Sequence, residues 1–586
     1  MLDFEKVEAP SPAPVNLLPA GLPLLIEGQS AGIPTILFRA ADGSFQLREL
    51  AATDNGGIAG TIVDGILPGL STAFDGQEPG DFALGPIVPF SFAQRNSDLG
   101  LPLARENKLV GQPVEIGIID AGIAFWNPAF LKEGGGIKTS RFASYCAVDV
   151  ISDGLTLSTA YDQAQLDQIV QLPEHEILAK LAQDFPTSVF GTKSNRPLYR
   201  RNGLAHGTAM ADLVIQEAPD DVRLHAVELP DSVLRDLTGG QMSVIMETAL
   251  RRVVERAAEV VTAGLSFDMV VLMAFGFTGG PQDGSAQILR SLEKTLADFA
   301  ARGINITLVL PVGNHRQDRV AAHLTAGQSV YWRTAPNDFS TNTVEMIQAK
   351  GSQAPQIAAP DGAASDLPTG EGLYRLKNSG ETIGAVWVSE VGANVITRVS
   401  LAPTAVASGF KTAAPHGRWT FSAQGSGADL WVLRDHTGFE GDPGKPFRSS
   451  WFDDAGYRGA DALGYPALDD ALNVSGARLS SVSRTGTASV LATSLAPGFV
   501  TVTANVGGAL APYAGQLGTG GTASASTDLA APAAKGTPRN QLPRHARDGR
   551  AVLGNGGPQR FRAAGTSLAA AIETGRIAAG NPSPTG

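Results

Sequence analysis

Four polar residues of this chain lie where side chains of their types could together carry out a nucleophilic hydrolysis. Asp120 ends the apolar run VEIGIID, His206 opens the run HGTAMADLV, and Ser567 opens the alanine-rich run SLAAAIE. Asn314 follows the apolar run INITLVLPVG. Aspartate, histidine and serine can serve as orienting carboxylate, general base and nucleophile. An asparagine amide can donate a hydrogen bond to an oxyanion.

Each of these residues has an ordinary structural explanation when it is taken alone. Asp120 precedes Ala-Gly and Asn314 follows a glycine, so both suit turns, and His206 could cap a helix or lie in a core. Ser567, after Gly-Thr, could simply cap a helix. Their joint occurrence favours the catalytic interpretation, because the chain order Asp, His, Ser is that of the subtilisin template.

Apolar strands that alternate with amphipathic helices must position these residues. The predicted strands cover 114–120, 222–230, 269–276 and 304–314, and the predicted helices cover 206–218, 243–260 and 286–303. Such alternation predicts a parallel α/β sheet with helices on both faces. Functional groups of open α/β sheets collect at the carboxyl ends of the strands, which is where the candidate residues lie.

A region without helical periodicity interrupts this pattern. The runs GAVWVSEV, NVITRVSLAP, GRWTFSAQ and ADLWVLRD alternate with a period of two, which predicts an antiparallel β-sandwich. After it, residues 489–506 predict a small-residue helix and an apolar strand. We therefore expect four segments: an N-terminal extension (1–87), which is a propeptide or a β-rich accessory region, the first part of a catalytic domain (88–325), an inserted β-sandwich with its linker (326–475), and a second catalytic part that carries the nucleophile (476–586).

Four motifs in this chain resemble those of the subtilisin-like serine peptidases, or subtilases. GIIDAGIAFWNPAF resembles their aspartate motif, HGTAMADLV their His-Gly-Thr-His-Val-Ala-Gly helix, LPVGN their Gly-Asn pair, and GTSLAAAIETG their Gly-Thr-Ser-Met-Ala-Ala-Pro motif. VTVTAN and STDLAAP match weaker signals that precede the serine. The resemblance covers about 90–335 and 480–580, in family order, and the chain looks like a divergent member with an inserted β-domain.

The resemblance implies a subtilisin-like doubly wound, mainly parallel sheet, interrupted by the antiparallel β-sandwich, and the activity of a serine endopeptidase that hydrolyses peptide bonds. Ser567 would attack the scissile carbonyl, His206 would act as general base and then acid, and Asp120 would hold the imidazole. The Asn314 amide and the backbone N–H of Ser567 would form the oxyanion hole.

The resemblance also implies where a substrate would bind. Ala274, Phe275 and Gly276 stand where subtilases carry a Ser-x-Gly segment that pairs with an extended substrate. Because main-chain groups make that pairing, it tolerates alanine in place of serine. Val312 and Gly313 would flank the primary specificity pocket.

Four positions depart from the subtilase pattern. Ala209 stands for the second histidine of the histidine motif, Asp212 for its glycine, Ala121 for the hydroxyl residue after the aspartate, and Ala571 for the proline after the serine. None of these removes a group that does chemistry. They leave open an alternative, a catalytically weak or inactive binding protein with the subtilase fold.

Four other features suggest different sites. Ser30 in GQSAG matches the nucleophile elbow of lipases, but the β-branched run IPTILF follows it where that elbow needs a helix. Residues 174–178, EHEIL, lack the second histidine of a metalloprotease helix, so a solvated helix start is expected. His315 either modulates the oxyanion hole or is an exposed loop histidine. GQLGTGGTASAS is expected to be a surface loop rather than a phosphate loop.

Composition excludes several classes of protein. A net charge of −12 argues against a general nucleic-acid binder, because phosphate neutralisation needs clustered lysine and arginine. The single cysteine, Cys146, excludes an intrachain disulfide and a cysteine-based zinc cage. We expect it in a buried strand.

The resemblance and the composition together predict the binding partners. We expect polypeptide substrates, no nucleic acid, no membrane and no cofactor in the reaction. Structural calcium is common in subtilases, but no Asp-x-Asp-x-Asp-Gly-type loop assigns a site for it. The sandwich could bind substrate, a carbohydrate or a protein partner. Without the pattern of a secretory signal peptide, we expect a cytoplasmic location, with unconventional secretion as the alternative.

Overall fold

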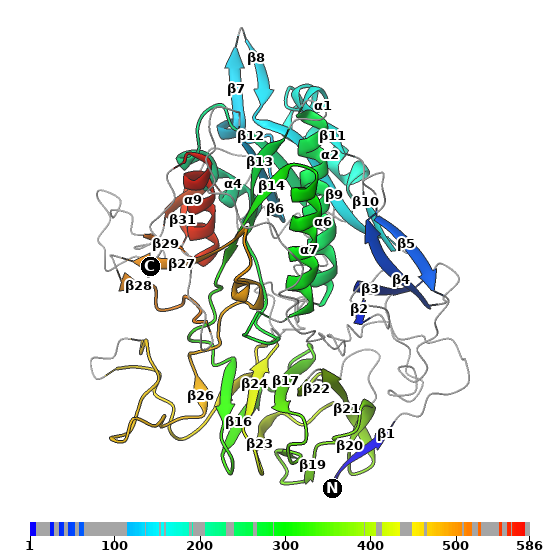
Figure 1. Ribbon diagram of the computed structural model, residues 1–586, viewed down its shortest axis with the longest axis vertical. Helices are drawn as coiled ribbons and strands as arrows, with labels where there is room; N and C mark the ends of the chain where they lie inside the picture. Colours follow the sequence, from blue (N-terminus) through cyan, green and yellow to red (C-terminus); the bar gives the residue numbers. More distant parts are fainter. Residues whose placement is uncertain are drawn as a thin grey trace.

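The computed structural model shows a mixed α/β protein with several sheets and few helices (Figure 1). The residues it describes are 1–6, 24–27, 34–39, 45–52, 58–63, 114–134, 136–151, 154–157, 160–186, 190, 206–229, 240–261, 266–284, 286–391, 393–405, 413–433, 448–461, 466–506, 509–517, 525–528, 550–553, 560–563 and 565–580.

A ten-stranded sheet carries the predicted site residues. Its main path runs β10-β9-β12-β6-β13-β14-β27-β28, and β11 and β29 pair with β9 and β27. The parallel strands are β9 (Phe142–Ile151), β12 (Arg223–Glu228), β6 (Glu115–Asp120), β13 (Phe267–Met273), β14 (Ile304–Pro311), β27 (Phe499–Val506) and β29 (Ala525–Asp528). The antiparallel pairs are made by β10 (Gly154–Leu157), β11 (Tyr161–Asp162) and β28 (Ala509–Leu510).

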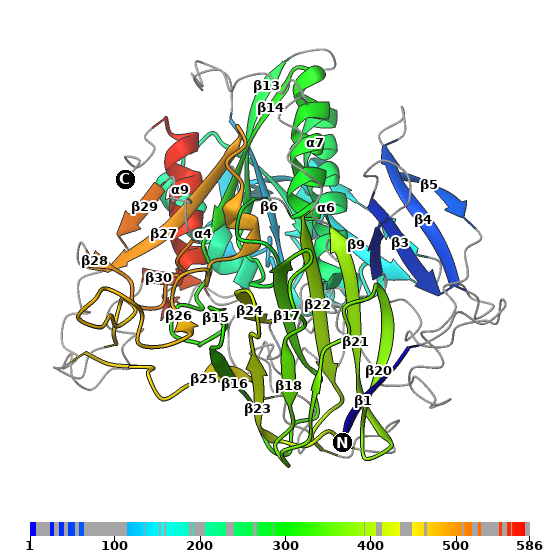
Figure 2. The same ribbon diagram turned by 60° about the horizontal axis from the view of Figure 1, so that its bottom comes forward.

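Helices pack on this sheet from two sides (Figures 1 and 2). On one side, α6 (Gly240–Val260) packs against β6, β9 and β12, and α7 (Gln287–Ala301) packs against β14. On the other, α4 (His206–Glu217) packs against β6 and α9 (Thr566–Ala578) packs against β13, β14 and β27. The side-chain alternation of β6 agrees with this, since a Cβ at Gly117 would meet Val253 of α6, whereas Asp120 contacts His206 of α4.

The central strands are buried along their length. Every residue of β6 is buried, as expected for a strand that is covered on both faces. Cys146 lies in β9 and is fully buried, as expected. Burial raises the pKa of its thiol to about 11, so it stays protonated at neutral pH and is a poor nucleophile.

Residues 321–453 contribute two antiparallel sheets that share a second core. One sheet has the order β1-β20-β21-β22-β17-β24-β15-β26 and the other β19-β18-β23-β16-β25. Trp332 and Trp419 of the smaller sheet and Val386 and Leu430 of the larger one lie in one buried apolar cluster. The strands are β15 (Ala321–Leu324), β16 (Ser329–Thr334), β17 (Asn342–Ala349), β18 (Gln356–Ala358), β19 (Ala364–Asp366), β20 (Gly372–Asn378), β21 (Glu381–Val391), β22 (Asn394–Leu401), β23 (Gly417–Ser422), β24 (Ala428–Val432), β25 (Trp451–Asp453) and β26 (Val482–Ser483).

The start of the chain joins this sandwich rather than the parallel sheet. Strand β1 (Leu2–Lys6) pairs antiparallel with β20 at the edge of the eight-stranded sheet. Leu2 is buried there, and Glu5 forms ion pairs with Arg375 and Lys377. The later strands β2 (Leu24–Glu27), β3 (Pro34–Arg39), β4 (Phe45–Ala52) and β5 (Ile58–Val63) form a separate antiparallel sheet in that order.

Short elements complete the described chain. They are η1 (Pro128–Phe130), the hairpin β7 (Leu131–Gly134) and β8 (Ile137–Ser140), α1 (Gln163–Ile169), α2 (Glu174–Asp184), η2 (Val490–Thr493), and the hairpin β30 (Arg550–Leu553) and β31 (Arg560–Ala563). The small-residue helix expected after 489 is only the single 3-10 turn η2, capped by Ser489 and followed closely by the Pro497-Gly498 pair. No helix among the described residues is long and apolar enough to span a membrane.

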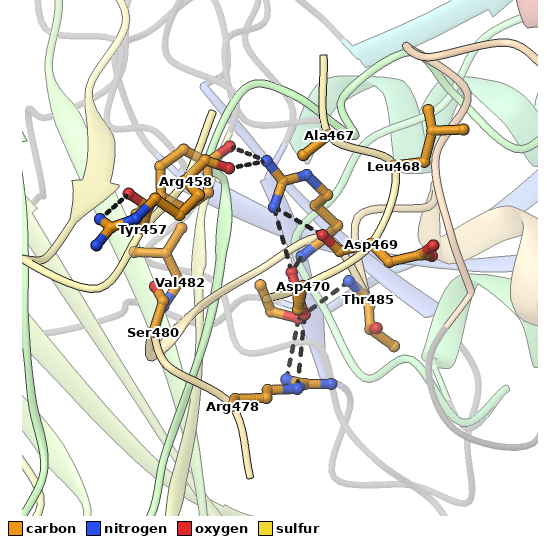
Figure 3. Close-up of polar contacts among 12 residues, drawn as sticks. Tyr457, Arg458, Ala467, Leu468, Asp469, Asp470, Arg478, Ser480, Val482 and Thr485 are labelled. Carbon is orange, nitrogen blue, oxygen red and sulfur yellow. Dashed lines mark hydrogen bonds and ion pairs between the residues drawn. The ribbon is translucent and has the colours of Figure 1, made fainter. Parts of the chain in front are cut away.

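Charged side chains stabilise the connector, the segment around residues 457–485 that leads from the sandwich back to the parallel sheet (Figure 3). The Asp470 carboxylate accepts hydrogen bonds from the Ser483 hydroxyl at 2.8 Å and the Arg484 backbone N–H at 2.9 Å. The Arg484 guanidinium lies 3.6 Å from the same carboxylate and donates to the Arg458 carbonyl at 2.6 Å. Both side chains are buried, with exposed fractions of 9% for Asp470 and 2% for Arg484.

The change Asp470→Ala should destabilise the protein strongly, because it leaves the buried Arg484 without its carboxylate. Removing one member of a buried ion pair costs about 3–5 kcal/mol. The change Lys294→Ala is the control, since it breaks an ion pair with Asp298 in which the two side chains are 65% and 36% exposed, and exposed pairs contribute about 0–1 kcal/mol. Urea unfolding monitored by tryptophan fluorescence measures both, and equal losses in the two variants would contradict the assignment.

Candidate active site

The structure joins Asp120 and His206 directly. The His206 Nδ1 lies 2.8 Å from Oδ1 and 2.9 Å from Oδ2 of Asp120. The carboxylate is buried at the end of β6, whereas the imidazole is 39% exposed at the first position of α4. A carboxylate can only accept, so Nδ1 carries the hydrogen and Nε2 is the basic nitrogen of the neutral ring. The unprotonated Nε2 of His206 can therefore accept a proton, as a general base must.

The loop after Asp120 is bonded to the first turn of α4. Gly207 N–H donates to the Ala121 carbonyl at 2.9 Å, and Thr208 N–H donates to the Gly122 carbonyl at 3.1 Å. The Thr208 hydroxyl also donates to Gly122 O at 2.7 Å and accepts from Ala124 N–H at 2.8 Å. The packing favours glycine at 207, because a Cβ there would lie only 2.5 Å from Ile123 Cγ1 and 3.0 Å from the Cβ of Asp120. These bonds fix the start of α4 against the aspartate.

Helices α4 and α9 lie side by side in close contact (Figures 1 and 2). A Cβ at Gly575 would lie only 2.5 Å from the Val214 carbonyl oxygen. Gly575 follows Ser567 by as many residues as Val214 follows His206. Arg576 also contacts Glu217. Helix α4 begins at the end of β6, where His206 contacts Asp120, and α9 begins beside Ala274 and Asn314, just after the ends of β13 and β14. Both helices therefore begin at the same edge of the parallel sheet, and His206 and Ser567 lie in their first turns at that edge.

Ser567 lies in the first turn of α9 and is 9% exposed. Its hydroxyl donates a hydrogen bond of 2.7 Å to the carbonyl of Ala274. Ser567 is thus held against Ala274, which follows β13 and belongs to the segment expected to bind substrate. Catalytic hydrogen bonds often form only when substrate is bound, so this orientation is compatible with a rotation of the hydroxyl towards a base.

Asn314 is bound to the residue that precedes Ser567. Its side-chain carbonyl accepts hydrogen bonds from the Thr566 backbone N–H at 2.9 Å and from the Thr566 hydroxyl at 3.0 Å. The same hydroxyl accepts from Gly313 N–H at 3.1 Å. Since Oδ1 is the acceptor in both contacts, Nδ2 is the end of the amide that remains as donor. The amide is oriented beside the start of α9.

The two segments predicted to bind substrate lie on either side of one serine. Ser489 N–H donates to the Val312 carbonyl at 2.7 Å, and a Cβ at Gly276 would lie 2.0 Å from the Ser489 hydroxyl oxygen. Gly276 can therefore not be replaced without displacing Ser489. Ala274 is buried and Phe275 is partly buried. The structure thus gathers 274–276 and 312–313 around 489.

Several of these residues carried little signal in the sequence. Thr566 stood in the GTS motif without a role of its own, and Ser489 had no motif. Glu228, which accepts two bonds from the loop after Asp120, had a usable signal: it is an acid at the carboxyl end of a buried apolar run, VRLHAVELP, as Asp120 is.

Three of the sequence features that suggested different sites are His315, the run EHEIL at 174–178 and Ser30. His315 contacts Asp318 of its own loop through Nδ1 at 2.9 Å. Glu174 begins α2, and the side chain of His175 is 78% exposed, as expected for a solvated helix start. Ser30 lies outside the described residues. In the described part of the chain, no group of three or more His, Cys, Asp or Glu side chains is arranged to hold a metal ion.

The chain was compared with family models, curated proteins and solved structures. No protein-family model matches the chain, and no curated protein matches it. Among solved structures, the chain is similar to the structure of the Clostridium perfringens CspB protease, with a TM-score of 0.48 and 13% sequence identity. The match covers 79% of this chain and 82% of that chain.

The change Gly575→Ala should force α4 and α9 apart, because the added methyl group would collide with the backbone of α4 at Val214. Overpacking of this kind costs about 1–3 kcal/mol. Gly134→Ala is the matched control, since a Cβ there would meet nothing within 4 Å. Thermal unfolding should show a lower Tm for the first variant alone, and an unchanged Tm for Gly575→Ala would refute the close contact.

Proposed function

We propose that this protein is a serine endopeptidase of the subtilase kind, which hydrolyses peptide bonds with Ser567, His206 and Asp120. The observation that carries the proposal is the buried Asp120 carboxylate holding His206 Nδ1 at the start of one helix, at the same edge of the sheet as Ser567 at the start of the neighbouring helix. The chain order and the four motifs support the same assignment.

In the proposed reaction, the Ser567 hydroxyl turns from the Ala274 carbonyl towards Nε2 of His206. As Oγ attacks the substrate carbonyl carbon, its proton passes to Nε2, and the imidazolium that forms is stabilised by the Asp120 carboxylate. The imidazolium then gives this proton to the leaving amine. Water, activated by the same imidazole, hydrolyses the acyl-enzyme and restores Ser567.

The oxyanion of the tetrahedral intermediate would be bound by Asn314 Nδ2 and by the backbone N–H of Ser567. The two bonds from Thr566 to Asn314 Oδ1 support this role, because they orient the amide before substrate arrives. The first N–H groups of a helix have no partner within the helix, and the helix N-terminus favours negative charge. A preorganised donor of this kind is the most valuable contribution to acyl transfer.

An extended polypeptide would pair with the backbone of Ala274, Phe275 and Gly276, as a strand added to an edge. Val312 and Gly313 would lie on the other side of the first substrate side chain. That both segments lie close to Ser489, through its bond to Val312 and its closeness to Gly276, supports their placement near one another. We propose polypeptide substrates for these reasons.

The finer architecture belongs to the same proposal. The parallel strands from β9 to β29, with α6 and α7 on one side and α4 and α9 on the other, support a doubly wound subtilase sheet. In this scheme 88–325 and 476–586 form the catalytic domain, 326–475 is an inserted sandwich, and 1–87 is an extension. The pairing of β1 with β20 favours an accessory role for the first six residues.

The second candidate is a catalytically weak or inactive binding protein on the same scaffold. The observation that favours it is the bond from the Ser567 hydroxyl to Ala274, together with alanine at 571, where subtilases carry proline. Covalent labelling separates the two candidates, because only an activated serine is acylated or phosphonylated quickly.

A fluorophosphonate probe should label the native protein at Ser567, as identified by peptide mapping. Ser567→Ala should abolish the label, and His206→Ala should lower its rate by several orders of magnitude because the base is lost. Ser475→Ala, which replaces an exposed serine outside the proposed site, is the matched control and should still be labelled. Native protein without label, or label that persists in Ser567→Ala, would refute the catalytic proposal.

Asn314→Ala should lower kcat by about 10²–10³ with little change in KM, because it removes an oxyanion donor that acts in the transition state. The measurement is steady-state hydrolysis of a peptide substrate. Thr566→Val, which removes one of the two bonds that orient the amide, should give a smaller loss of about 5- to 10-fold. A larger loss in Thr566→Val than in Asn314→Ala would contradict the assigned roles.

A further inference from the structure

A second carboxyl group lies beside the proposed catalytic aspartate. Glu228 is the last residue of β12, and its register partner in the neighbouring parallel strand β6 is Asp120. Register partners on adjacent strands project to the same face, here the face of α4. Glu228 is fully buried, and no step of the proposed reaction uses it.

The Glu228 carboxylate binds the loop that follows Asp120. Its Oε1 accepts a hydrogen bond from Gly122 N–H at 2.8 Å, and its Oε2 accepts one from Ile123 N–H at 3.0 Å. The carbonyl of Gly122 accepts in turn from Thr208 in the first turn of α4. A continuous set of hydrogen bonds therefore leads from Glu228 through the loop to the helix that begins at His206.

We propose that Glu228 is a positioning residue for the Asp120–His206 pair: its ionised carboxylate holds the loop 121–124, and through the loop the start of α4, in the catalytic arrangement. The inference rests on the proposed peptidase function and extends it. Glu228 touches neither substrate nor the reacting atoms, so its effect passes entirely through the loop.

Ionisation matters because each carboxylate oxygen has its own donor. A protonated carboxyl group carries a hydrogen on one oxygen and no net charge, so that oxygen accepts a bond from its backbone N–H much more weakly. One of the two bonds to the loop is weakened. Protonation of Glu228 should therefore loosen the loop, and with it the contact of His206 with Asp120.

The surroundings of Glu228 set the pH at which this happens. The charged or titratable groups that face it are Asp120 from β6 and the buried Tyr145 hydroxyl from β9, and the loop presents only backbone N–H groups. Burial, opposed by the two backbone bonds and assisted by the charge of Asp120, raises the pKa of Glu228 from 4.5 to about 7. The group therefore changes charge within the working range of a histidine base.

The raised pKa also argues against a role in stability alone. Because the native state binds this proton more tightly than the unfolded chain, the contribution of Glu228 to folding falls as pH rises from 4.5 through about 7. Above pH 7 the protein keeps a buried negative charge that burial disfavours. A strained group beside a reactive centre is typical of functional sites.

Glu228→Gln tests the proposal, since glutamine has one acceptor oxygen and one amino group and so resembles the protonated acid. At pH 8 its rate of phosphonylation by a fluorophosphonate should fall by at least about tenfold, the loss expected for a hydrogen bond to a charged group. Its Tm relative to the native protein should rise as pH increases. On the acid side, the logarithm of the native rate should fall with a slope steeper than one over the pH range in which Glu228 takes up its proton, whereas the variant should show a slope of one, for His206 alone.

Glu115→Gln is the matched control. Glu115 is a fully buried carboxylate at the other end of β6, bonded to His225 Nε2 at 2.7 Å and Arg223 Nε at 2.8 Å. This variant should lose thermal stability but keep the native slope and rate. If the steeper pH dependence disappears in Glu228→Gln but persists in Glu115→Gln, Glu228 acts by positioning the site. General damage to the sheet would affect both variants.

The outcomes are distinguishable. Native phosphonylation with a slope of one, or a folded Glu228→Gln that keeps the native rate and slope, overturns the role of Glu228 and leaves the peptidase proposal intact. Native protein that is not phosphonylated at any pH overturns both. If Glu228→Gln does not fold, the slope of the native protein alone decides the question.

Discussion

The contact between the Asp120 carboxylate and the imidazole of His206 is the interaction on which the proposed site depends. Asp120 stands where β6 ends, and His206 stands where α4 begins, so the contact depends on a rigid loop 121–124, which follows Asp120 and packs against the start of α4. Backbone bonds from Gly207 and Thr208 to that loop provide this rigidity. The buried acid at the end of β12 binds the loop from its other side. Apart from the partly exposed imidazole, the polar network is buried and its members are paired, which is the condition under which such networks specify one geometry.

The second constraint is the close contact of α4 and α9. Small side chains along α9, including Ala569, Ala570 and Ala571, are fully buried, and Gly575 permits an approach that no larger residue would allow. The serine motif is therefore also a packing motif. Its alanines and glycine set the distance between two parallel helices, and its hydroxyl lies at the end of the surface that they share. Stability and site geometry rest on the same residues.

Sequence patterns predicted the elements well and the contacts between them less well. The strand that ends at Asp120 and the helices that begin at His206 and near Ser567 could be located from periodicity and flanking residues, because local preferences decide them. The bond from Ser567 to Ala274, the orientation of Asn314 by Thr566 and the insertion of Ser489 between two segments depend on tertiary approach, which no local pattern encodes. The same reason explains why the pairing of β1 with β20 was not foreseen. Where a short helix was expected after 489, proline and glycine shortly beyond it favoured a single turn.

The central claim is that these residues form a working hydrolytic site, and cleavage of an unfolded polypeptide tests it most directly. Purified protein would be incubated with reduced, carboxymethylated polypeptide in H₂¹⁸O, and the products would be analysed by mass spectrometry. The account predicts new internal termini whose carboxylates carry ¹⁸O, formed by the native protein and not by Ser567→Ala prepared in parallel. Intact substrate after incubation with folded native protein, or equal cleavage by the two preparations, would contradict it.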